Sequence, residues 1–156
     1  MLQAMVIVKT LVAAIITLAN VECFLEIDTL CKMVDSRNDR WTLNRLNREW
    51  SRPRTEIQAE VAQIVSKQPE EVQAIYKKLV LSEMAKKEAE FEVDMIVLRD
   101  RGASQKLLDL KEKIHNITLD MQLSRRQVYK EIKQLKQSVS WKDRLMLHNS
   151  DYSCEK

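Results

Sequence analysis

The sequence predicts an all-α fold: a compact domain of five to seven helices, in an orthogonal or EF-hand-like packing, behind an N-terminal signal peptide. The 156 residues include only one Gly and two Pro, whereas folds rich in strands and tight turns depend on both residue types. Lys, Glu, Gln, Leu and Ala, which favour helices, are abundant instead. A content of 45% apolar and 31% charged residues is typical of a globular chain rather than a disordered one.

An apolar segment near the N-terminus predicts export. Residues 5–21 contain a single charge, Lys9. The uncharged run that follows has the length of a signal-peptide core and is short for a membrane span of roughly 20 residues. We expect cleavage after Cys23, which gives a signal peptide at 1–23, a helical domain at 24–147 and a polar tail at 148–156. A retained membrane anchor is the alternative.

The cysteines predict one disulfide in the exported chain. Cleavage after Cys23 leaves Cys31 and Cys154, and an even pair in an oxidising compartment favours a bridge. Such a bridge would tie the two ends of the domain together and stabilise the fold by about 4 kcal/mol. Two unpaired thiols are the alternative, and a cut at Ala19 would leave Cys23 as a third candidate.

Three helices are expected in the first half of the mature chain. Apolar residues recur at helical spacing over 24–34, 42–50 and 55–67. The polar stretch 35–39 between the first two is turn-like. In the second helix the apolar face runs from Leu43 to Trp50, so Trp50 is expected in the core.

The fourth helix is expected to be long. Pro69 suits its first position, where a missing N–H costs nothing. No further breaker occurs before Gly102, which is typical of a helix C-terminus. Glu88 interrupts the apolar stripe, and about 30 helical residues would reach roughly 45 Å. We therefore expect a bend or break near 86–89, or an end that projects.

Two more helices are expected before the C-terminus. The first covers 104–115 and is followed by a loop at 116–123. The second begins at 124–127, Ser-Arg-Arg-Gln, which is a capping-box pattern. A short last turn with Trp141 and Leu145 is expected to close the core.

Catalytic and metal-binding signals are weak, so no enzyme activity and no cofactor are expected. The two histidines, His115 and His148, have no second ligand at metal spacing. The acidic stretch 35–39 lacks the central Gly and terminal Glu of a calcium loop. One glycine cannot form a phosphate-binding loop. A formal net charge of +3 is too small to indicate a nucleic-acid partner.

Three features could serve binding or modification. Arg45, Arg48 and Arg52 lie among tryptophans and could contact an anionic surface, although an ordinary solvated helix face is the favoured interpretation. Asn116 begins an N-glycosylation sequon, Asn-Ile-Thr. A third set of apolar side chains could line a site for a hydrophobic ligand, although such residues more often simply pack in the core. This set is Met84, Phe91 and Met95.

Two stretches resemble the SXP/RAL family of small secreted nematode proteins. Residues 41–50 are similar to the family's threonine-initiated helix that ends in tryptophan. Residues 107–145 include Leu-Ser-Arg-Arg-Gln at 123–127, similar to the family's helix start of leucine, hydroxyl, two residues and glutamine. The Arg-rich helix and the Trp141 segment depart from the family's usual Ala- and Lys-rich composition.

The resemblance implies a compact helical antigen that is secreted by a nematode and recognised by host antibodies. Lipid binding has been suspected for such proteins, and the family has no accepted catalytic residues. We expect a secreted, non-catalytic antigen or effector that binds an extracellular protein or a small hydrophobic ligand, without nucleic acid or stable membrane insertion. A helical carrier of fatty acids and a coiled-coil protein that pairs through 69–101 are the alternatives.

Overall fold

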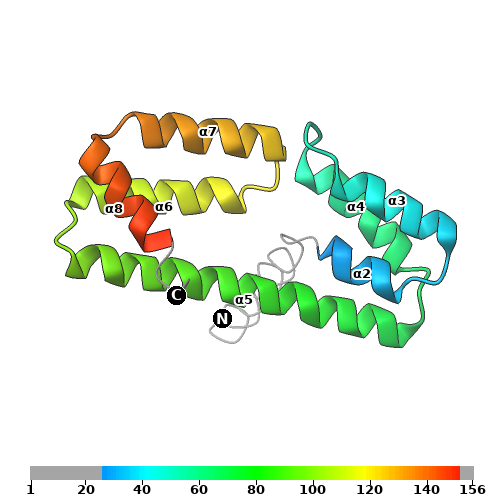
Figure 1. The fold of residues 1–156 in the computed structure, drawn as a ribbon. Coiled ribbons are helices and arrows are strands. Elements are labelled where there is room, and N and C mark those ends of the chain that lie inside the picture. Colours follow the sequence, from blue (N-terminus) through cyan, green and yellow to red (C-terminus); the bar gives the residue numbers. More distant parts are fainter. Residues whose placement is uncertain (1–25, 152–156) are drawn as a thin grey trace, which may run out of the picture. The chain divides into compact units, whose positions relative to one another are not determined.

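The computed structural model describes residues 26–151, and within them it confirms the all-α prediction (Figure 1). The described residues form helices and no strand; one isolated bridge joins Pro53 and Ser124. The predicted signal peptide and Cys154 lie outside this range. The helices are α2 (Ile27–Met33), α3 (Arg37–Asn47), α4 (Arg54–Val65), α5 (Glu70–Asp100), α6 (Gln105–Leu119), α7 (Arg125–Gln137) and α8 (Trp141–Asp151).

The chain divides into two compact units. The first unit contains the described residues up to Arg48 together with 58–84, and the second contains 49–57 and the described residues from 85 onward. Helices α4 and α5 therefore contribute to both units. From the sequence we expected one domain at 24–147 and did not predict two units within it.

The first unit is built on the pairing of α2 and α3, which α4 and the first half of α5 join. Asn47 Nδ2 donates to Asp28 Oδ1 at 2.7 Å and so links α3 to α2. The unit's buried apolar residues recur three or four positions apart along each helix, with more exposed polar residues between them, which is the amphipathic pattern. They are Ile27, Leu30, Val34, Leu43, Leu46, Val61, Ile64 and Val80.

Helix α3 begins earlier than expected. Ser36 accepts a hydrogen bond from the Asp39 backbone N–H at 3.3 Å, which is N-capping. The stretch 35–39, expected to be a turn, is therefore largely the first turn of α3. The helix ends at Asn47, so Trp50 lies beyond it, and its side chain is 54% exposed rather than in the core.

Tyr76 gives the first unit a pH dependence that can be measured. Burial, with a smaller effect of the Glu26 carboxylate, raises the pKa of Tyr76 from 10.0 to about 12. The unfolded chain ionises this phenol first, so the stability it contributes is complete below pH 10 and is lost as pH rises through 12. At about 1.4 kcal/mol per unit of pKa, the loss is about 3 kcal/mol.

We expect Tyr76→Phe to remove this part of the alkaline destabilisation. Urea unfolding of both proteins at neutral pH and across pH 10–12 tests it, because the lysines that also titrate there are common to both. Parallel losses of unfolding free energy in the two proteins would contradict the assignment to Tyr76.

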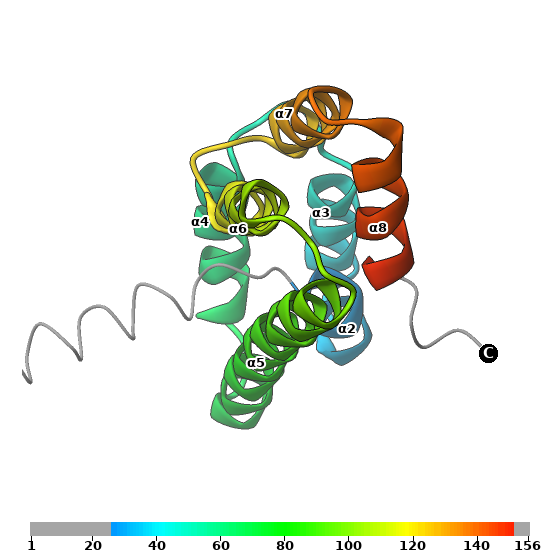
Figure 2. The ribbon, with the colours of Figure 1, turned by 90° about the vertical axis from the view of Figure 1, so that its left-hand side faces the viewer.

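The second unit packs the end of α5, α6, α7 and α8 around a leucine core. Figures 1 and 2 show α8 running from the end of α7 back toward α5. Gly102 ends α5 with φ +71°, as predicted, while the Ala103 N–H donates to the Leu98 carbonyl at 2.9 Å. The predicted capping box of Ser124 and Gln127 is also present at the start of α7. The core residues are Leu98, Leu107, Leu108, Leu110 and Leu147.

Helix α8 corrects the expected closure of the core. It runs to Asp151 and buries Leu147, with Met146 packed against the same cluster. Residues 146 and 147 lie on the side of the helix opposite to 141 and 145 at 100° per residue. Trp141 and Leu145 are consequently 72% and 47% exposed, and the prediction that they close the core is wrong.

The expected break in the long helix is absent, because α5 is a continuous helix from Glu70 to Asp100. Glu88, which interrupts the apolar stripe, has a partner: its Oε2 lies 3.2 Å from His115 Nε2. The polar residue therefore marks a contact with α6 rather than a break. In residues 26–151, no helix combines the length and the apolar composition that a membrane span requires.

Candidate ligand groove between α6 and α7

Helices α6 and α7 form a helical hairpin within the second unit, side by side in Figure 1. Ser104 caps α6 by accepting from the Leu107 N–H at 3.3 Å. Ser124 caps α7 and is itself buried. The two caps fix where both helices begin and leave a short connection after Leu119.

Arg54 holds the connection between the two helices. Its guanidinium donates to three main-chain carbonyls: to Thr118 at 2.9 Å, to Asp120 at 2.6 Å and to Leu123 at 3.2 Å. The Thr118 carbonyl lies in the last turn of α6, where the helix dipole favours a positive charge. Arg54 therefore satisfies carbonyls that the end of the helix leaves without a partner in the helix itself.

Backbone pairing fixes the same connection a second time. The Arg126 N–H donates to the Trp50 carbonyl at 2.9 Å, and the Thr55 N–H donates to the Met121 carbonyl at 3.0 Å. The isolated antiparallel bridge between Pro53 and Ser124 lies between these bonds. The segment before α4 is thus fastened along the α6–α7 connection.

Two polar contacts fasten α6 to α5. Lys111 Nζ lies 2.7 Å from Asp94 Oδ2, and the two side chains are 11% and 16% exposed. One turn further along α6, His115 contacts Glu88 and stacks on Phe91, with ring centroids 3.9 Å apart and an interplanar angle of 12°. These contacts hold one side of α6 against α5 and leave the other side to α7.

Helix α7 covers α6 incompletely. Its apolar residues fall on one face, yet none of the residues of α7 is fully buried. A groove with a volume of about 460 Å³ remains between α6 and α7, within the range of about 300–1,000 Å³ usual for small-molecule sites. It is lined by Lys113, Asn116, Ile117, Glu131, Gln134, Leu135 and Ser138.

The groove combines an apolar surface with a few polar groups. Ile117 and Leu135 supply aliphatic surface from the two helices. The helices run antiparallel, so Lys113 and Ser138 lie toward one end and Glu131 toward the other. This composition suits a largely apolar ligand with one polar or charged end. The described residues contain no group of three or more His, Cys, Asp or Glu placed to hold a metal ion.

Asn116 lies on the rim of this groove. Its side chain is exposed, but the sequon lies in α6 rather than in the expected loop at 116–123. Backbone hydrogen bonds continue the helix past the sequon, since the Asp120 N–H donates to the Asn116 carbonyl at 3.0 Å. Within the same last turn, Thr118 Oγ1 donates to the Ile114 carbonyl at 2.9 Å. The helix C-cap is Asp120.

The expected hydrophobic-ligand residues do not line the groove. Phe91 is stacked on His115, and Met95 packs against the leucine core of the second unit. Met84 belongs to the first unit. Phe91 and Met95 therefore serve the packing of α5, which is the alternative use of such a stripe.

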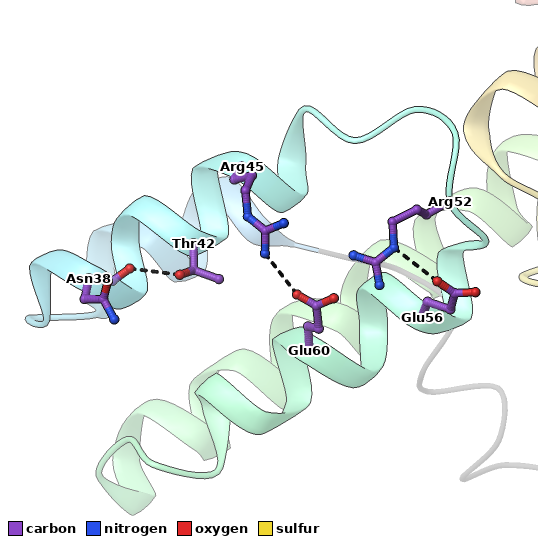
Figure 3. Close-up of polar contacts among 6 residues, drawn as sticks. All are labelled: Asn38, Thr42, Arg45, Arg52, Glu56 and Glu60. Atoms are coloured by element: carbon purple, nitrogen blue, oxygen red, sulfur yellow. Dashed lines mark hydrogen bonds and ion pairs between the residues drawn. The ribbon is translucent and has the colours of Figure 1, made fainter.

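Two of the three expected anion-binding arginines hold carboxylates of the chain itself. Arg45 lies 3.2 Å from Glu60 in the first unit, and Arg52 lies 3.1 Å from Glu56 in the second. Figure 3 shows both pairs, with the Thr42 hydroxyl donating to the Asn38 carbonyl nearby. Arg48 is exposed. Arg45 lies on α3, whereas Arg48 is the C-cap of that helix and Arg52 lies in the segment before α4, so the three arginines do not share the expected helix face.

Cys31 forms no disulfide with any residue of 26–151. Its Sγ lies 4.0 Å from Asn44 Oδ1. Burial raises the pKa of the Cys31 thiol, and the nearby Asp28 carboxylate acts in the same direction. The expected partner Cys154 lies outside the described residues, so the bridge stays a prediction.

Sequence reasoning missed most of the groove residues. Only Asn116 was singled out, and for glycosylation. Lys113, Glu131 and Gln134 look like solvated residues of amphipathic helices, which is the commoner use of charged and amide side chains beside an apolar stripe. The available signal was the spacing of 131, 134, 135 and 138 on one edge of α7.

No family model matches the chain. The curated proteins and the solved structures likewise hold no match.

Proposed function

We propose that this protein is exported and acts outside the cell as a non-catalytic binding protein, with the groove between α6 and α7 as its ligand site. The observation that carries the proposal is the groove itself. Helix α7 has no fully buried residue, and aliphatic side chains line the space that remains between it and α6. The ligand that fits is a small apolar molecule with one polar end. Membership of the SXP/RAL family belongs to the same proposal and rests on the two helix signatures.

Filling the groove tests the binding site. Gln134 lines the groove and is exposed, so Gln134→Trp would occupy the space without disturbing the leucine core. We expect at least about a tenfold weaker affinity for a fluorescent fatty acid that oleate displaces, because the ligand loses most of its apolar contact.

Gln137→Trp is the matched control, since Gln137 is exposed on the same helix and does not line the groove. Equal affinity in the two variants would place the ligand elsewhere. Absence of any displacement by oleate at micromolar concentration in the unaltered protein would exclude the fatty-acid carrier.

Mass spectrometry of the natively secreted protein tests export. We expect an N-terminus at Phe24, a Cys31–Cys154 bridge and a glycan on Asn116. Because Asn116 lies on the rim of the groove, a glycan there would stand beside the ligand. Protein retained in the cytosol with its first residue intact would contradict the proposal.

The coiled-coil alternative has less support. Helix α5 is 31 residues long, but Val80 is buried in the first unit and Leu98 in the core of the second. Exposed apolar residues remain on α5 at Ile75, Leu81, Val93 and Ile96, but they are separated by six, twelve and three residues and do not repeat as the a and d positions of heptads.

A further inference from the structure

Positive charge is concentrated in α7 and α8. Residues 125–145 carry seven basic and two acidic side chains. The whole chain has 26 basic and 23 acidic residues, so the remainder is slightly acidic. A local excess of this kind creates a field that attracts anionic partners even where the overall charge is small.

The cations of α7 are separated from its groove. At 100° per residue, the basic residues and Tyr129 fall on one side of the helix, and the single acid, Glu131, falls on the groove side. Tyr129 is 62% exposed, and Lys133 Nζ lies 5.9 Å from the centroid of its ring. Arg126 and Lys130 are exposed on the same side.

Helix α8 presents exposed apolar side chains beside further cations. Trp141 and Leu145 are four residues apart and therefore adjacent on the outer face of the helix. Lys142 and Arg144 flank them and are exposed. Within residues 26–151, none of Arg126, Lys130, Lys142 and Arg144 pairs its side chain with a carboxylate.

We propose that the outer faces of α7 and α8 dock on the surface of an anionic phospholipid membrane. Lysine and arginine near such a surface contribute about 1 kcal/mol each by attraction to acidic head groups. Trp and Tyr favour the interface between head groups and acyl chains, because their rings are apolar and their N–H or O–H stays wet. Leu145 adds apolar area that a sulfated polysaccharide would leave unused. The surface lies on the membrane without spanning it.

Vesicle sedimentation of the full mature chain tests the proposal. We expect binding to phosphatidylcholine vesicles that contain phosphatidylserine, weak binding to pure phosphatidylcholine, and loss of binding at high salt. Trp141→Ala with Leu145→Ala should weaken binding at least about tenfold, since two bulky side chains no longer enter the interface. Lys130→Glu with Lys133→Glu should do the same through charge.

Each pair of substitutions has a matched control. Val93→Ala with Ile96→Ala removes two exposed apolar residues from α5, and Lys77→Glu with Lys78→Glu reverses two exposed charges of the first unit. Both control variants should bind vesicles like the parent. Equal binding to vesicles with and without phosphatidylserine would overturn the proposal, as would parent-like binding by the α8 variant. Binding to heparin without binding to vesicles would assign the surface to polysaccharide instead.

Discussion

Arg54→Ala is expected to lower the unfolding free energy of the second unit by about 3 kcal/mol. The guanidinium donates to the carbonyls of Thr118, Asp120 and Leu123 and is partly buried. A hydrogen bond to a charged group contributes about 1.5–3 kcal/mol, and the substitution removes the shared donor of all three carbonyls. Urea unfolding followed by circular dichroism measures the change.

Arg54→Lys separates charge from geometry. A lysine keeps the positive charge at the end of α6 but presents a compact ammonium, which cannot replace a planar fork that contacts three carbonyls. We expect it to recover less than half of the lost stability. Arg48→Ala, at an exposed position, is the control and should change the free energy by less than about 0.5 kcal/mol. A stability of Arg54→Ala equal to that of the control would show that backbone pairing alone holds the connection.

Local signals in the sequence were sufficient for much of the helical framework. Gly102 ends α5 because a positive φ is available to glycine at low cost, and Ser124 with Gln127 forms the capping box that the pattern predicts. Both depend on residues within a few positions of each other. The start of α3 at Ser36 followed the same rule and was missed, since the polar stretch after it was interpreted as a turn.

The errors occurred where the outcome depends on distant partners. Glu88 looked like a break in α5 until His115 of α6 supplied its contact. Trp50 was placed in the core because it continues the apolar spacing of the second helix, and Trp141 because it was expected in a short last turn. In the structure α3 ends before Trp50, and α8 turns Trp141 outward. The position of an aromatic residue in the sequence does not predict which side of a short terminal helix packs against the core.

The candidate groove could not be predicted for the same reason. Its lining comes from two helices, and the space exists because α7 covers α6 only in part. A sequence pattern can give the apolar face of each helix, whereas the depth to which the faces interlock depends on the connection that Arg54 and the bridge at Pro53 hold. The basic faces of α7 and α8 were visible as charge, but their exposure required the fold.

The buried pair of Asp94 and Lys111 should give the other large effect. The two groups lie 2.7 Å apart with little exposure, so each compensates part of the hydration that the other loses on burial. Asp94→Ala leaves an ammonium ion without this partner, and breaking a buried pair in this way costs about 3–5 kcal/mol. Thermal or urea unfolding of the variant measures it. Glu90 on α5 provides the matched control, because its exposed carboxylate lies 3.9 Å from Lys86 Nζ and 3.0 Å from Lys87 Nζ. Glu90→Ala should cost at most about 1 kcal/mol.

Replacing both partners distinguishes an electrostatic contact from simple packing. Asp94→Leu with Lys111→Met removes both charges and keeps much of the volume, so no buried ion is left without a partner. We expect this double variant to be within about 1 kcal/mol of the parent or more stable, although each single variant is strongly destabilised. A double-mutant cycle built from Asp94→Leu, Lys111→Met and the double variant then gives the interaction energy between these two side chains. Additive losses, with the double variant weaker than either single one, would mean that the side chains stabilise the unit through separate contacts and that the ion pair does not fasten α6 to α5.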